Sequence, residues 1–304
     1  FASHSLMLSG EIGVNFFMDL SGLSDAEKEA SYMTFEISGK GTVPSGNVPY
    51  NAEFMSKTGG YYGFSCYVNS IQMADTITAT FHYGDHQTVS ETYSVKQYIE
   101  SFDAYNANPE NVPYDDETIA LVHALADYGH YVQPFLSAAH DWTIGVGDDQ
   151  YAEMDAVYAK SYDITAIKTA VADDAIGRTL CGDVEKVTYT LLMDSDTAIY
   201  LYFKPVSTYE GDFSVTVDGK TATATKKGDR YLVIIPNIGA HKLGDPYTVV
   251  ATTANGESTV TVSALSYVNG ILNAGAYADN QTAQYAVAAI YAYYDAAIKY
   301  QATH

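Results

Sequence analysis

The sequence has little positive charge, one tryptophan and two cysteines. The shortages of positive charge and of cysteine limit the classes of protein to which it can belong. Only 15 Lys and Arg stand against 37 Asp and Glu, which gives a formal charge of −22. A surface this acidic repels phosphate, so binding to nucleic acid and to anionic membranes is disfavoured. No run of about 18 apolar residues occurs, and we therefore expect no membrane insertion.

The two cysteines are too few for a disulfide framework. Cys66 alternates with Phe64 and Val68 on one face of an expected strand, which favours a buried free thiol packed as a small apolar residue. A bridge between Cys66 and Cys181 is the alternative. Neither arrangement implies a redox function.

Tyrosine is abundant where tryptophan is scarce, with 28 Tyr against one Trp. Tyr offers apolar area with a polar tip and suits exposed sheet faces and recognition surfaces. The length of 304 residues leaves room for about two domains. The chain starts at Phe1 within a strand pattern, so we expect a fragment of a longer, exported protein.

We interpret one long stretch, residues 73–133, as occurring twice; chance similarity among strands rich in Tyr, Val and Thr is the alternative. Thr78 matches Thr248 at an offset of 170, and Leu125 matches Ile290 at an offset of 165. Nearer the N-terminus, residues 32–40 align with residues 212–220. The falling offset means that the first copy carries longer connections. A repeat of this length makes each copy the size of a domain.

Alternation of apolar and polar residues predicts antiparallel strands in both copies. Their number and spacing suggest an immunoglobulin-like sandwich. The expected strands are 5–20, 33–38, 61–68, 77–83 and 88–95 in the first copy, and 187–193, 197–203, 213–217, 221–225, 231–235, 247–253 and 258–262 in the second.

Helical segments are expected after each set of strands. A linker, 101–116, leads to a helix that starts at Asp115-Asp116, where acidic residues favour the helix N-terminus, and that Pro134 kinks or ends. Further helices are expected at 148–162, 164–176 and 277–301, and the polar, helix-prone residues 21–31 are interpreted as a surface insertion. The fold class is therefore α+β, two copies of an antiparallel immunoglobulin-like sandwich, each followed by a helical segment. The expected domain map is 1–105, 106–180, 181–275 and 276–304.

Motifs that carry catalysis are missing. Gly145-Val146-Gly147 lacks the rest of a phosphate-binding loop, and the sequence contains no H-E-x-x-H, C-x-x-C or G-x-S-x-G. Paired carboxylates for glycoside hydrolysis stay open as an alternative, because the chain is rich in acids. We expect no enzyme.

Metal ligands are sparse. His123, Asp127 and His130 fall on one helical face at spacings of four and three, which suits zinc, but a solvated polar stripe is the favoured interpretation. The second copy has other residues there, so the fold does not need them. We expect no cofactor; calcium at Asp148-Asp149 or Asp194-Ser195-Asp196 is the alternative.

Exposed aromatic side chains are the remaining candidates for a binding site, because Tyr and Trp on a rigid scaffold dominate binding energy at interfaces. Packing between sheet and helix is the alternative for each of them. The candidates are Tyr61, Tyr67, Trp142, Tyr200, Tyr202, Tyr291 and Tyr294.

The runs at 75–81 (DTITATF), 93–99 (YSVKQYI) and 121–133 (LVHALADYGHYVQ) resemble a β-plus-helix module of large cell-surface proteins from gut Firmicutes. In that family a Tyr-Ser-Val-x-x-Tyr strand end is typically followed by a helix that ends in Leu-x-Tyr-Gly-x-x-x-Gln. The second copy departs from the pattern, with Tyr293-Tyr294 in place of Tyr128-Gly129.

This resemblance implies an extracellular position on a Gram-positive bacterium, within a larger surface protein. Some proteins of this general kind bind host immunoglobulin. The resulting hypothesis is a cell-surface adhesion or binding module for a host protein, immunoglobulin being the named guess, or for a glycan. A structural spacer and a carbohydrate-active enzyme with an unrecognised site are the alternatives.

Overall fold

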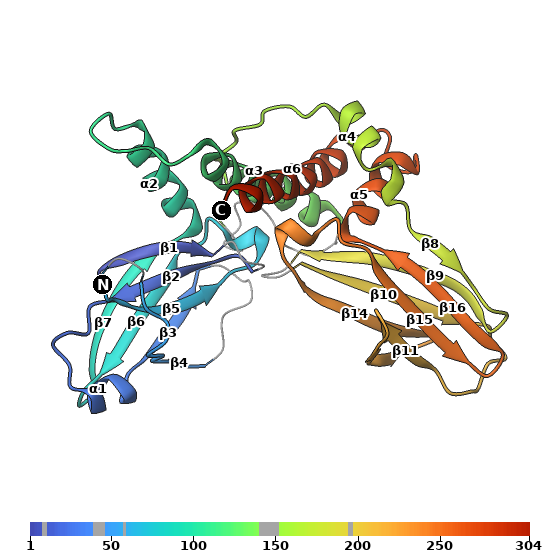
Figure 1. Cartoon of the computed structure of the whole chain (residues 1–304), viewed down its shortest axis with the longest axis horizontal. Helices are drawn as coiled ribbons and strands as arrows, with labels where there is room; N and C mark the ends of the chain where they lie inside the picture. The colour runs from blue at the N-terminus through green and yellow to red at the C-terminus, as the bar shows by residue number, and fades with distance from the viewer. Residues whose placement is uncertain (8–10, 39–45, 57–58, 140–151, 194–196) are drawn as a thin grey trace. The chain divides into compact units, whose positions relative to one another are not determined.

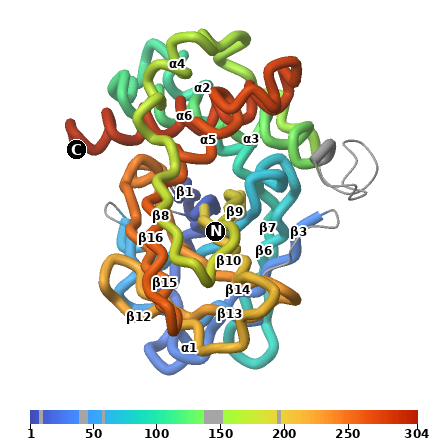
Figure 2. The backbone as a smooth tube through the Cα atoms, turned by 90° about the vertical axis from the view of Figure 1, so that its right-hand side faces the viewer, coloured from blue at the N-terminus to red at the C-terminus, as the bar shows by residue number. Residues whose placement is uncertain are grey.

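The computed structural model describes residues 1–7, 11–38, 46–56, 59–139, 152–193 and 197–304. Contacts between residues divide the chain into two compact units, residues 1–159 (unit 1) and 160–304 (unit 2). Both units combine antiparallel sheets with helices, as Figures 1 and 2 show. The expected α+β class with antiparallel strands is confirmed.

Unit 1 has two sheets, one with the strand order β1-β2-β5 and one with the order β4-β3-β6-β7. Neighbouring strands are antiparallel throughout. The strands are β1 (Ser3–Met7), β2 (Gly13–Met18), β3 (Tyr32–Ile37), β4 (Val48–Pro49), β5 (Tyr62–Tyr67), β6 (Ile77–Tyr83) and β7 (Gln87–Tyr93).

Aromatic contacts join the two sheets of unit 1. The ring of Phe16 lies 5.6 Å from that of Phe35, and the ring of Phe64 lies 5.5 Å from that of Phe81. All four side chains are buried. Each such burial is worth about 2 kcal/mol, so these pairs hold the sheets face to face.

Unit 2 also has two sheets, with the strand orders β13-β14-β10-β9 and β12-β11-β15-β16-β8. The ring of Phe203 lies 5.7 Å from that of Phe213 between the two sheets. The strands are β8 (Gly177–Thr179), β9 (Val184–Met193), β10 (Thr197–Pro205), β11 (Ser214–Val217), β12 (Lys220–Ala222), β13 (Ala224–Lys227), β14 (Arg230–Ile238), β15 (Tyr247–Thr253) and β16 (Gly256–Val262).

Two helices follow the last hairpin of each unit. No helix in the described part of the chain is long and apolar enough to cross a membrane. The helices are α1 (Asp25–Ala30), α2 (Val95–Ala107), α3 (Asp116–Ala139), α4 (Ile164–Ala170), α5 (Ala264–Asn273) and α6 (Gln281–Thr303), with the 3₁₀ turns η1 (Ser70–Gln72), η2 (Ala172–Asp174) and η3 (Ala240–Lys242).

Helices α2 and α5 were not predicted. The expected linker 101–116 was wrong in its first part, because α2 occupies it as far as Ala107. The side chains of Ser94 and Ser263 accept hydrogen bonds from the backbone N–H three residues on, and so start these helices as N-caps. The strand-like composition of the residues before each cap hid this signal.

Three further expectations were wrong. Residues 152–162 form neither helix nor strand, although a helix was expected there. Pro134 does not end the helix, the second of the two outcomes expected for it, because it lies inside α3, which continues to Ala139. The single strand expected at 221–225 is two short strands, β12 and β13, that join different sheets. Strands 77–83 and 247–253 were predicted with the observed bounds.

Two pairs of residues that the sequence comparison aligned can be located in the structure. Phe35 in β3 lies opposite Ala79 in β6, and Val215 in β11 lies opposite Ala251 in β15. Leu125 and Ile290 are both buried, in α3 and α6. These correspondences hold within each unit separately.

Candidate functional site

A group of hydrogen-bonded polar side chains in unit 1 lies on one face of α3. This helix starts where the Asp115 carboxylate accepts a hydrogen bond of 2.8 Å from the N–H of Thr118. Apolar residues such as Leu125 and Val132 are fully buried. The polar side chains lie on another face of the same helix.

That face holds an extended segment, residues 152–159, which we call the strap. The two carboxylate oxygens of Asp127 accept hydrogen bonds from the N–H groups of Tyr158 (2.5 Å) and Ala159 (2.6 Å). The Gln133 side chain accepts from the N–H of Met154 (2.8 Å) and donates to the carbonyl of Ala152 (2.9 Å). Side chains of α3 therefore bind backbone groups of the strap.

Two histidines complete the contact. Nδ1 of His130 lies 2.5 Å from the carbonyl oxygen of Met154. The His123 ring stacks on that of Tyr158 with 3.6 Å between centroids, and its Nε2 lies 2.8 Å from Asp103. The Tyr158 hydroxyl also donates to Asp103.

The solvated stripe expected at His123, Asp127 and His130 was wrong, since Asp127 is buried and all three side chains contact other parts of unit 1. Within the described residues, no group of three His, Cys, Asp or Glu is arranged to hold a metal ion. Both calcium candidates, at 148–149 and 194–196, lie outside those residues.

Burial raises the pKa of two carboxyl groups that bind the strap. Asp75 accepts a hydrogen bond of 2.5 Å from the N–H of Ala152, and desolvation raises its pKa to about 6. Desolvation also raises the pKa of Asp127, against the opposing effect of the N–H groups of Ala159 and Tyr158. Both groups therefore bind a proton more readily than an exposed Asp.

The aromatic candidates in unit 1 do not form one surface that the structure describes. Tyr67 at the end of β5 is 38% exposed, and Tyr61 is half-buried before that strand. Trp142 lies outside the described residues.

Tyr200 and Tyr202 of unit 2 lie on the outer face of the sheet β13-β14-β10-β9. Between them on β10, Leu201 points into the core and is fully buried, whereas both tyrosines are half-exposed. Tyr200 lies opposite Ile234 of β14, which is 42% exposed. On the other side, Thr190 and Thr188 of β9 lie opposite the two tyrosines.

The same sheet concentrates positive charge in a strongly acidic chain. Its four strands carry five Lys and Arg and one Glu. Strand alternation places Lys186 and Lys227 on the side of the tyrosines. Lys204 lies there as well and pairs with Glu185 at 3.0 Å. We call this surface, formed by Tyr200, Tyr202, Ile234, Lys186, Lys204 and Lys227, the basic face.

The corresponding sheet of unit 1, β1-β2-β5, has neither feature. Its strands contain no Lys, Arg, Asp or Glu. On its outer side the ring of Phe54 lies 5.7 Å from that of Phe17 and shields it. Asn15 is hydrogen-bonded to Ser5 and Ser65 across the three strands. This side is therefore internally bonded and covered at Phe17, although Tyr67 at its edge is exposed.

Tyr291 and Tyr294 of α6 are half-buried, and their rings lie 6.3 Å apart. A Cβ atom at Gly244 would lie 2.6 Å from the hydroxyl of Tyr294, so this side chain packs on the backbone after η3. The packing alternative is the better account of Tyr294.

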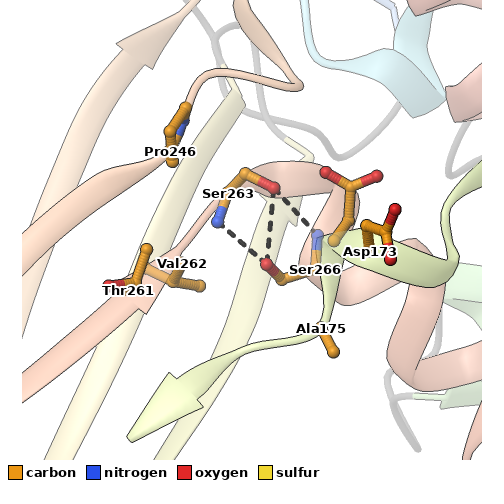
Figure 3. A pocket seen from close by; sticks show the side chains of 8 residues that line it. Asp173, Ala175, Pro246, Thr261, Val262, Ser263 and Ser266 are labelled. Atoms are coloured by element: carbon orange, nitrogen blue, oxygen red, sulfur yellow. Dashed lines mark hydrogen bonds between the residues drawn. The ribbon is translucent and has the colours of Figure 1, made fainter.

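A small cavity lies beside the start of α5 (Figure 3). Its volume is about 70 Å³, and Asp173, Asp174, Ser263 and Ser266 are among the residues that line it. The two serines bond each other's backbone N–H as a helix cap. Desolvation, then the neighbouring Asp173, raises the pKa of Asp174. A space this small holds water rather than a substrate, which usually needs about 300 Å³ or more.

Both cysteines are free thiols. Cys66 is buried, as expected, and burial raises its pKa to about 12. Cys181 is half-buried, with Ser258 donating to its sulfur at 3.3 Å.

No protein-family model and no curated protein matches this chain. The site therefore has to be interpreted from its own geometry.

The sequence pattern missed Gln133, Asp75 and the strap. Gln133 continues the spacing of His123, Asp127 and His130 along α3, and that spacing was the available signal. Nothing in the composition of residues 152–159 indicates an extended segment bonded to a helix.

Proposed function

We propose that this chain is a non-enzymatic binding module of an extracellular bacterial surface protein, and that it binds a protein partner through the basic face. The observation that carries this proposal is the half-exposed pair Tyr200 and Tyr202 beside the exposed Ile234, on regular strands and flanked by lysines. Tyr anchors with a polar rim are typical of protein interfaces.

The two units are further proposed to descend from one immunoglobulin-like sandwich with two following helices. The shared strand orders support this: β1-β2-β5 corresponds to β9-β10-β14, and β3-β6-β7 corresponds to β11-β15-β16. The turns after η1 and η3 support it too, since Met73 and Leu243 have the same φ of −61° and ψ of −24°.

A protein fits the basic face better than a glycan does. Sugar sites are concave and place several polar groups around each ring, whereas this face is one side of a regular sheet with Tyr, Thr and Ile side chains. The resemblance to gut bacterial surface proteins makes host immunoglobulin the first partner to test. Binding at this face would also agree with a location on the cell surface.

Binding of purified immunoglobulin and other abundant secreted host proteins to the immobilised chain tests the proposal. Replacing Tyr200 and Tyr202 together by Ser is expected to weaken the interaction about tenfold or more. Tyr277→Ser is the matched control, because Tyr277 is 39% exposed in the same unit and lies outside the four strands of the basic face. Equal binding by the double variant and the wild type would contradict the proposal.

A structural spacer is the second candidate, favoured by the way each unit folds around its own core. A spacer would bind nothing itself. Its test is deletion of the chain from the parent protein, where unchanged binding by the parent supports the spacer and lost binding supports the module.

A further inference from the structure

Charge is divided unequally between the two units. Unit 1 has 22 Asp and Glu against 4 Lys and Arg, whereas unit 2 has 15 against 11. Within unit 1, the stretch 97–159 contains 12 acids and no Lys or Arg. The basic face therefore occurs on a chain that also carries a large surface of the opposite sign.

The acidic stretch includes an exposed apolar group at the connection between α2 and α3. Val112 is 83% exposed, Tyr114 is 48% exposed and Tyr105 is 41% exposed. The acids Glu110, Asp115, Asp116 and Glu117 surround them in sequence. We call these seven residues the acidic cap.

The acidic cap is held in one shape by its own hydrogen bonds. Asn106 accepts from the N–H of Tyr114 at 2.9 Å, and the Asn111 side chain donates to the carbonyl of Tyr105 at 3.0 Å. The Tyr114 ring also stacks on Phe102 at 4.9 Å. A surface that is already ordered loses little conformational entropy when it binds.

We propose that the acidic cap of one copy of this chain docks on the basic face of a second copy. Each surface offers exposed aromatic and aliphatic area, and their charges are opposite. Among the described residues, Lys186 and Lys227 have no ion-pair partner within the chain. Opposite charge at a contact both steers the encounter and excludes partners of the wrong sign.

The two surfaces are different parts of the chain, so the contact is heterologous and repeats from copy to copy. This inference rests on the proposed function, because it names the partner of the same face. It makes the module self-adhesive, and a host protein that binds the basic face would compete with the second copy.

Sedimentation equilibrium of the purified chain tests the contact. The average mass is expected to rise well above 33.0 kDa with concentration. Raising the salt from about 50 to about 500 mM is expected to return it towards the single chain, because exposed charges are screened. A mass that stays at that of one chain at concentrations up to about 0.5 mM overturns the inference, since the dissociation constant of the contact would then be millimolar or higher.

A charge exchange makes the test specific. Lys186→Glu with Lys227→Glu, and separately Glu110→Lys with Asp116→Lys, should each abolish association, since like charges then meet. A mixture of the two variants should associate again, because both of its contacts are complementary. Lys168→Glu with Lys242→Glu is the control, with the same change of net charge away from the basic face, and it should associate like the wild type.

The inference is overturned if the mixture stays unassociated or the control loses association equally. Its failure can be told apart from failure of the proposed function. A chain that stays single but binds immunoglobulin through Tyr200 and Tyr202 refutes self-docking alone, whereas a chain that does neither refutes both.

Discussion

The long helices α3 and α6 each pack on the 3₁₀ turn of their own unit, η1 or η3. The two contacts differ in whether the helix or the turn supplies the large side chain. In unit 1 the helix supplies Gly129, and a Cβ there would lie 2.7 Å from the sulfur of Met73 after the turn. In unit 2 the helix supplies Tyr294 and the turn supplies Gly244. In each unit a glycine therefore makes room for a large side chain between helix and turn, but the glycine lies on the helix in unit 1 and after the turn in unit 2.

The helices differ more strongly on a second face. Asp127 binds the strap, whereas the matched residue of α6 is Ala292. Helix α6 contacts another helix, α4, and the ring of Tyr162 before α4 meets that of Tyr285 on α6 edge-on at 5.8 Å. A polar face suits an extended chain with unpaired N–H groups, and an alanine face suits a helix whose backbone is already bonded. The covering segment therefore decides the chemistry of the helix.

The largest expected effect is that of Asp127→Ala in α3. Two N–H groups of the strap lose their acceptors, and we expect a loss of about 3 kcal/mol in unfolding free energy. Asp127→Asn should recover part of this, because its amide oxygen still accepts one bond. Urea unfolding of the three proteins measures the effect, and equal midpoints would show that the strap does not depend on Asp127.

The contact between Gly129 and Met73 predicts that Gly129→Leu lowers the free energy of unfolding by about 2 kcal/mol, because the new side chain overpacks the site beside Met73. In a Met73→Ala background the same substitution should cost at least about 1 kcal/mol less, since the alanine leaves room for it. A double-mutant cycle by urea unfolding checks this. Additive costs would mean that the two residues do not share a volume.

Asp75→Asn should stabilise the chain at pH 7 by about 1 kcal/mol. Burial raises the folded-state pKa of Asp75 to about 6, from an ordinary 3.8. The folded chain therefore binds the proton more tightly than the unfolded chain does, and this group adds stability as the pH falls from about 7 to 4. The substitution should flatten that rise. Unfolding midpoints at several pH values decide it, and an unchanged slope would remove Asp75 as the cause.

The smallest effect is expected for Asp295→Ala in α6, about 0.3 kcal/mol. Its ion pair with Lys299, at 2.5 Å, is exposed and joins residues one helical turn apart. It serves as the counterpart of Asp127→Ala, since both remove a helical aspartate. A cost near that of Asp127→Ala would mean that the strap contact is not what distinguishes α3.

Much of the fold could be predicted because alternation along strands is a local signal. Strand β6, with buried Ile77, Ala79 and Phe81 at every second position, was predicted with its observed bounds. The hairpin to β7 and the long helix α3 followed from turn and cap residues in the same way. Helix α2 was missed because Ser94 caps it within a stretch whose Tyr and Val residues favour strands.

The strap could not be predicted for a different reason. Its contacts join residues such as Asp75 and Ala152, which are 77 positions apart, and depend on where α3 carries its polar face. The spacing of His123, Asp127 and His130 showed that they share a face, but not what covers it. The basic face is an intermediate case: its tyrosines were predicted as candidates, while its charge emerged only when β9, β10, β13 and β14 were placed side by side.

Backbone hydrogen exchange, measured with and without a bound partner, tests most directly the claim that the two units differ in the chemistry of their surfaces. The account predicts slower exchange in β9, β10 and β14 when the chain associates or binds a host protein, together with residues 105–117 in the self-associated form. Slower exchange in β1, β2 and β5 of unit 1, with β10 unchanged, would contradict it.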